Sequence, residues 1–268
     1  MSRIQLFSDI HTEFIQGKHE QPIDIYKQLV QSNVDLLVIA GDLGAPLDEF
    51  KRWKEQAYID ALTFFCNNYP HVLLIPGNHD FYHGSFDRFR RFASRLLLSN
   101  LTIQTSQFGL EEYKLNEDTM IYASTLWFKN RPSNSQCFGV MNDSRYIEDS
   151  LNQIHAVAKK QVEDLKKKVG PNDVVITHHA PTSSILSRYE PGYAAQQFYY
   201  NEDAEKVIKN NKPKVWCFGH THISEDKIIG ETRLISNPMG YYGHNNSSEA
   251  GFFEFQNINF KPDLVIEV

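Results

Sequence analysis

Cysteine is scarce in this sequence. Only Cys66, Cys137 and Cys217 occur, and their odd number and wide spacing argue against a disulfide framework. No run approaches the ~20 apolar residues of a membrane span, and the N-terminal MSRIQLFSDI has no basic region followed by a long apolar one. We therefore expect a cytoplasmic protein with no membrane partner.

A positive charge balance is absent as well. The chain has 27 Lys and Arg against 33 Asp and Glu, a formal net charge of −6. Non-specific binding to nucleic acid depends on many Lys and Arg contacts to phosphate, so a nucleic-acid partner is possible but not favoured. Binding of a phosphate group would need local positive charge, which metal ions can supply.

The chain also lacks a Ser/Gly-rich or Pro-rich linker, a low-complexity segment and an internal repeat. Its 268 residues lie at the upper end of what one domain holds. We therefore expect residues 1–268 to form a single domain.

Short apolar runs rich in Val, Ile and Leu recur along the chain, bounded by turn-forming residues, a pattern typical of strands buried on both faces. Between them, apolar residues at helical spacing predict helices over 48–68, 147–168 and 203–211. Because strands and helices alternate, the sequence indicates an α/β fold. The predicted strands are 4–7, 35–40, 72–75, 120–124, 173–177, 214–218, 232–236, 252–255 and 264–268.

Polar clusters follow five of these strands. Taken singly, each has a simpler interpretation as a turn or a helix cap. In α/β sheets, however, sites gather beyond the carboxyl ends of strands, so five loops distant in sequence are expected to converge on one patch. Their carboxylates, imidazoles and amide, without thiolates, suit divalent Mn, Fe or Zn. The clusters are SDIH (8–11), GDLG (41–44), GNHD (77–80), HHAP (178–181) and GHTH (219–222).

In this order the clusters resemble the motifs of the calcineurin-like metallophosphoesterase superfamily, namely D-x-H, GD, GNHD, H-H-x-P and GHTH. The resemblance spans residues 9–222. The chain has GDLGAP and GNHD where serine/threonine protein phosphatases usually carry GD-x-x-DRG and GNHE, which favours another branch. The fold implied is a four-layer α/β/β/α sandwich with two packed mixed β-sheets.

The resemblance also implies a cofactor of two divalent metal ions, Mn²⁺, Fe²⁺/Fe³⁺ or Zn²⁺. Of the two adjacent histidines, we expect His178 to be a ligand and His179 to lie behind it. By their positions in the motifs, the expected ligands are Asp9, His11 and His222 for the first ion, Asn78, His178 and His220 for the second, and Asp42 as the bridge.

The activity implied is hydrolysis of a phosphodiester or phosphomonoester on a small or nucleotide-like substrate. A metal-held hydroxide would attack phosphorus while His79 protonates the departing alkoxide. Asp80 is expected either to accept a hydrogen bond from a ring nitrogen of His79 or to fix the loop.

Further candidates for substrate contact lie outside the motifs. Segment 127–149 is polar and contains Arg131 and Arg145, so it is either a lid insertion whose arginines reach the substrate phosphate or a packed surface excursion. After the strand at 232–236, residues 237–241 are expected to shape the floor of the pocket, with Tyr241 or His244 facing the ligand.

Two other functions are also compatible with the sequence. One is a catalytically inactive scaffold of the same fold, although every matched motif position is occupied. The other is a nuclease of the same superfamily, although the chain has neither a DNA-binding extension nor a basic balance.

Overall fold

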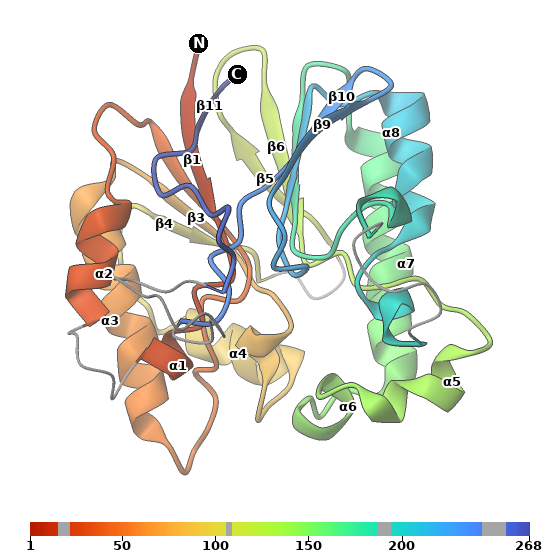
Figure 1. Ribbon diagram of the computed structural model, residues 1–268, viewed down its shortest axis with the longest axis horizontal. Helices are drawn as coiled ribbons and strands as arrows, with labels where there is room; N and C mark the ends of the chain where they lie inside the picture. The colour runs from red at the N-terminus through yellow and green to blue at the C-terminus, as the bar shows by residue number, and fades with distance from the viewer. Residues whose placement is uncertain (16–21, 106–108, 187–193, 243–255) are drawn as a thin grey trace.

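Two mixed β-sheets lie face to face at the centre of the protein (Figure 1). The computed structural model describes residues 1–15, 22–105, 109–186, 194–242 and 256–268. In the first sheet the strand order is β11-β1-β2-β3-β4, with β1 to β4 parallel and β11 antiparallel to β1. Its strands are β1 Arg3–Phe7, β2 Leu36–Ala40, β3 Val72–Ile75, β4 Leu101–Ile103 and β11 Val265–Glu267.

The second sheet has the order β5-β6-β7-β8-β10-β9. Its four central strands, β6, β7, β8 and β10, are parallel, whereas β5 and β9 pair antiparallel at the two edges. Its strands are β5 Glu111–Lys114, β6 Met120–Ser124, β7 Val174–Thr177, β8 Val215–Phe218, β9 Glu225–Ile229 and β10 Thr232–Ser236.

The period of two along each strand divides its apolar side chains between two layers. In β1, Ile4 and Leu6 enter the core between the sheets, where they join Ile176 from β7, while Phe7 faces the helices. In β8, Cys217 joins the core between the sheets and Trp216 faces the opposite way. Such strands need apolar cover on both faces.

Helices supply that cover (Figure 1). α2 and α3 lie outside the first sheet, and α7 and α8 outside the second, so the predicted four-layer α/β/β/α sandwich is confirmed. Among the described residues, no helix has both the length and the apolar character needed to cross a membrane. The α-helices are α1 Thr12–Ile15, α2 Pro22–Leu29, α3 Arg52–Asn68, α4 Phe86–Ala93, α5 Asn134–Cys137, α6 Asp143–Tyr146, α7 Leu151–Lys168 and α8 Glu205–Asn211.

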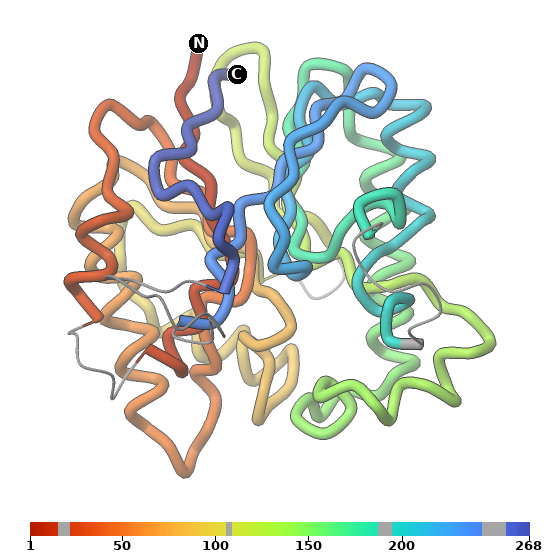
Figure 2. Tube along the Cα trace, in the orientation of Figure 1, coloured from red at the N-terminus to blue at the C-terminus, as the bar shows by residue number. Residues whose placement is uncertain are grey.

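The parallel strands of both sheets end at the same edge of the sandwich. The loop after β1 meets the loop after β10 there, through a bridge between Ser8 and Pro238. The two chain termini lie side by side at the opposite end (Figure 2). Loops from both sheets therefore meet at one edge, as the strand-end clusters predicted.

Some predicted elements differ from the structure. The helix predicted from residue 48 begins at Arg52, because the Asp48 carboxylate accepts hydrogen bonds from Phe50 N (3.2 Å) and Lys54 Nζ (2.9 Å) in a turn before it. Phe50 is 97% exposed rather than part of the apolar face. The strands β4, β5 and β9 were not predicted, and the predicted strand 252–255 lies outside the described residues.

Candidate metal centre

The motif loops hold their side chains with unusual backbone angles. Non-glycine residues rarely adopt positive φ, and such strain concentrates at functional sites. Five residues of the motif loops adopt it here. They are Asp9 (56°), His11 (52°), Asp42 (53°), His220 (66°) and His222 (52°).

A first group of donor atoms forms from the loops after β1 and β8. His222 Nε2 lies 3.3 Å from Asp9 Oδ1 and 3.1 Å from His11 Nε2. Asp9 is buried and accepts a hydrogen bond from the backbone N–H of His220 at 3.1 Å, which fixes its carboxylate. These three side chains can place a nitrogen or oxygen atom each around one cation.

A second group contains Asp42, His178 and His220, with Asn78 beside them. His178 Nε2 lies 3.4 Å from Asp42 Oδ2 and 3.1 Å from Asn78 Oδ1. The Nδ1 atom of His178 is 3.0 Å from the carbonyl oxygen of Ala40, a contact that orients its ring. Asp42 Oδ2 is also 3.8 Å from His11 Nε2, so Asp42 lies between the two groups.

Several observations test whether these residues suit metal ions. Burial and the neighbouring His179 and His178 hold the pKa of His220 well below its usual range, and its Nε2 has no hydrogen-bond partner among the described residues. A Cβ atom on Gly77 would lie 2.2 Å from Asp42 Oδ1, so only glycine leaves that space open. The donors are carboxylate, imidazole and amide groups, a set that fits borderline divalent ions.

In the GNHD loop, the Asp80 carboxylate binds backbone N–H groups and Tyr58. Asp80 accepts hydrogen bonds from Tyr58 Oη (2.6 Å), Gly77 N (2.7 Å) and Asp42 N (2.9 Å). These contacts match the loop-fixing alternative. The carboxylate beside the His79 ring is instead Glu13, whose Oε1 lies 2.9 Å from His79 Nδ1.

Glu13 is a residue that the sequence analysis missed. It is buried in α1, and its Oε1 is also 3.3 Å from His11 Nδ1. Burial alone would raise the pKa of Glu13, but hydrogen bonds with His11 and His79 lower it to about 2. Gly44 makes room for this arrangement, since a Cβ there would lie 2.2 Å from Thr12 Oγ1 and 3.2 Å from Glu13 Oε2.

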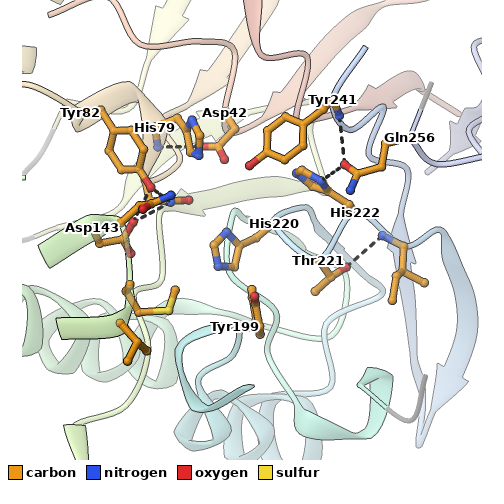
Figure 3. A pocket seen from close by; sticks show the side chains of 15 residues that line it. Asp42, His79, Tyr82, Asp143, Tyr199, His220, Thr221, His222, Tyr241 and Gln256 are labelled. Atoms are coloured by element: carbon orange, nitrogen blue, oxygen red, sulfur yellow. Dashed lines mark hydrogen bonds between the residues drawn. The ribbon is translucent and has the colours of Figure 1, made fainter. Parts of the chain in front are cut away.

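A cavity of about 550 Å³ opens over both groups (Figure 3). Burial alone would lower the pKa of His79, but the carboxylates of Asp42 and Glu13 raise it to about 9. The side chains around the cavity come from both halves of the chain. They are Asp42, Asn78, His79, Tyr82, Val140, Met141, Asn142, Asp143, Tyr199, His220, Thr221, His222, Ile223, Tyr241 and Gln256.

Of the expected substrate contacts, only Tyr241 lines this cavity within the part of the chain that is described. Arg131 donates to Glu202 Oε2 (2.6 Å) and to the carbonyl of Gln197 (3.0 Å) instead. Arg145 lines a separate hollow on the surface. His244 lies outside the described residues.

Segment 127–149 and His179 lie next to the donor groups. Segment 127–149 contains α5 and α6, and its residues 140–143 form one wall of the cavity. His179 is buried behind the donor groups: its Nδ1 lies 3.2 Å from the carbonyl oxygen of Thr125, and its ring is 4.2 Å from that of His220.

The chain matches the family model for calcineurin-like phosphoesterases over residues 2–224. A comparison with curated proteins finds no match. Two similar solved structures are a phosphopantetheinyl hydrolase from Mycobacterium tuberculosis (12% identity, 90% of each chain covered, TM-score 0.68) and a dimetal phosphatase from Danio rerio (12% identity, 90% of this chain and 88% of that chain covered, TM-score 0.58). At such identities, the likeness concerns the fold. The family match shows that this chain belongs to the calcineurin-like phosphoesterases, a family of metal-dependent enzymes.

Proposed function

We propose that this enzyme is a phosphodiesterase whose substrate carries one negative charge at phosphorus and an uncharged, partly apolar group beyond it. The observation that carries the proposal is the composition of the cavity wall. Val140, Met141 and Ile223 give it apolar surface, and Tyr199 and Tyr241 give it aromatic surface. Lysine and arginine are absent from its described lining residues.

Charge distinguishes a phosphodiester from more highly charged substrates. Arginine and lysine side chains commonly bind the additional phosphate groups of such substrates. The described wall instead contains the buried carboxylate Asp143. The segments outside the described residues add few cations by sequence: 243–255 has none, while 16–21 and 187–193 have Lys18 and Arg188. The same wall disfavours a nuclease, whose substrate is a polyanion.

The two donor groups are the proposed metal sites. When bound, two divalent ions supply Lewis-acid activation of water and of the phosphate oxygens. Asp42, which lies between the groups, would contact both ions. The first ion would be held by Asp9, His11 and His222, and the second by Asn78, His178 and His220.

His79 is the proposed general acid. It lines the cavity, and its Nδ1 is engaged by Glu13, which leaves Nε2 as the ring nitrogen for the leaving-group oxygen. A cation at Asp42 would offset the charge of that carboxylate, and Glu13 would then remain as the hydrogen-bonded carboxylate that favours the protonated form of His79. His79 therefore donates a proton to the departing alkoxide.

A substrate panel tests the proposal. Protein freed of metal by chelation and reloaded with Mn²⁺ is assayed with an alkyl phosphodiester, a phosphopantetheinyl ester, a phosphomonoester and a nucleoside diphosphate. A missing charge-assisted hydrogen bond costs about 1.5–3 kcal/mol, so we expect kcat/KM for the nucleoside diphosphate to be about 10–100-fold below that for the diester. Equal or faster hydrolysis of the diphosphate would contradict the proposed substrate class.

Glu13→Gln is expected to move the pH profile. His79 acts while protonated, so kcat falls as the pH rises through its pKa, which the neighbouring carboxylates, Glu13 among them, raise. Loss of an opposite charge at this distance lowers such a pKa by about 1–3 pH units, so the alkaline decline should move to lower pH by that amount. The measurement is kcat against pH. Glu49→Gln, at an exposed carboxylate paired with Arg88, is the matched control, and an unmoved profile in Glu13→Gln would rule out the role of Glu13.

A further inference from the structure

Asp143 contacts the candidate metal centre from a segment outside all five motifs. It begins α6, is only 1% exposed, and lies beside Tyr82 on one side of the cavity (Figure 3). Its Oδ1 accepts hydrogen bonds from Asn78 Nδ2 at 2.9 Å and from Tyr82 Oη at 2.8 Å. This hydrogen bond therefore links Asn78 to a residue 65 positions later in the sequence.

The hydrogen bond from Asn78 to Asp143 determines which end of the Asn78 amide faces the candidate metal centre. The two ends of an asparagine amide have nearly the same shape, but only the oxygen can bind a cation, while the NH₂ group can only donate. An ionised carboxylate accepts hydrogen bonds and donates none. Asp143 therefore selects the orientation in which Asn78 Nδ2 faces away from the centre and Oδ1 faces His178, 3.1 Å from its Nε2.

Tyr82 extends the same arrangement to the proposed general acid. Its ring stacks on that of His79, with a centroid distance of 4.2 Å and an interplanar angle of 28°. Its hydroxyl group also lies 3.1 Å from Asn78 Nδ2. One carboxylate oxygen of Asp143 therefore orders two neighbours, the amide of Asn78 and the aromatic ring that packs against His79.

We propose that Asp143 is a positioning residue that orients the Asn78 amide for the second metal ion and so sets the affinity of that site. This inference rests on the proposed function, since it takes Asn78 as a ligand. Asp143 would act through Asn78 and is not among the proposed ligands of either ion. The proposal also gives segment 127–149 a role, because the stretch that forms the cavity wall completes the metal centre.

Calorimetric titration of metal-free protein with Mn²⁺ tests the proposal without any assay of activity. Loss of a residue that orients a metal ligand typically lowers metal affinity about 10–100-fold, and we expect Asp143→Ala to do so at one of the two sites. Glu148→Ala, at an exposed carboxylate of the same segment that pairs with Arg88, is the matched control, with both affinities near those of the unmodified protein. Two unchanged affinities in a folded Asp143→Ala protein would overturn the proposal.

A second pair of variants preserves side-chain volume in case the alanine variant does not fold. Asp143→Asn replaces a charged acceptor by a weaker neutral one, so the second-site affinity should fall about threefold to tenfold. An Asn78→Asp background removes the choice between amide ends, because either carboxylate oxygen can bind a cation, so there the same change should lower the affinity much less. A fall of equal size in both backgrounds would overturn the proposal, because the effect of Asp143 would then not pass through the Asn78 amide. Binding of fewer than two ions by the unmodified protein would instead contradict the proposed function.

Discussion

His79→Ala is expected to lower kcat for an alkyl phosphodiester by about 10²–10⁴, the usual contribution of a general acid. An alkoxide is a poor leaving group and needs a proton as it departs, whereas nitrophenolate leaves readily without one. The loss should therefore be much smaller with a nitrophenyl diester. The measurement is kcat for both substrates, with the ratio between them as the quantity of interest.

Metal content separates this effect from damage to the metal centre. His79 contributes no donor atom to the two proposed metal sites, so bound metal should stay near two ions per chain in the variant. Its backbone N–H donates to Asp42 Oδ1 at 2.8 Å, a contact that alanine keeps. Full activity with the alkyl substrate would remove His79 from the mechanism. Equal losses with both substrates would show that the variant disturbs something other than proton donation.

The architecture and the meeting of the motif loops could be predicted because both follow from local patterns. Apolar runs of four to six residues indicate buried strands, and parallel strands place their carboxyl ends at one edge. That rule suffices to bring Asp9, Asp42 and His178 together from positions far apart in the sequence. This rule does not depend on the orientations of individual side chains.

The hydrogen-bond partners within the site could not be predicted, because they depend on tertiary contacts. Asp80 adjoins His79 in sequence, yet Glu13, 66 residues away, contacts the His79 ring. A glutamate in the first turn of a helix is ordinary, since it interacts favourably with the helix dipole, so Glu13 gave no distinct signal. Asp143 lies in the first turn of α6, so it gave no distinct signal for the same reason.

The misplaced candidates have a related explanation. The sequence predicts Arg131 as a substrate contact because arginine binds phosphate, but its guanidinium group pairs with Glu202 and lies 4.9 Å from the centre of the Tyr200 ring. A cation in a polar segment is as readily satisfied by a neighbouring carboxylate as by a ligand. Charge alone therefore does not identify a substrate contact, whereas several ligand types at strand ends do identify a shared site.

Gly77→Ala is expected to abolish binding at the second metal site. A Cβ atom at this position would lie 2.2 Å from Asp42 Oδ1 and 2.6 Å from both His178 Nε2 and Asp42 N. The backbone contact means that turning one side chain away cannot relieve the clash. Displacement of catalytic groups by about 1 Å can cost about 10²-fold in rate, so we expect kcat to fall at least that far. Metal titration and kcat are the measurements.

Gly139→Ala provides the matched control, because a Cβ there would meet no atom within 4 Å and φ is not positive. It should keep both metal ions and normal turnover, although Gly139 precedes the Val140 wall of the same cavity. Overpacking typically destabilises a protein by about 1–3 kcal/mol, so denaturant unfolding should show a folded but weakened Gly77→Ala protein. If that folded protein still bound two ions with unchanged affinity, the space between Asp42 and His178 could not be the second metal site. The roles assigned to Asn78 and Asp143 would then fail with it, since both depend on an ion at that position.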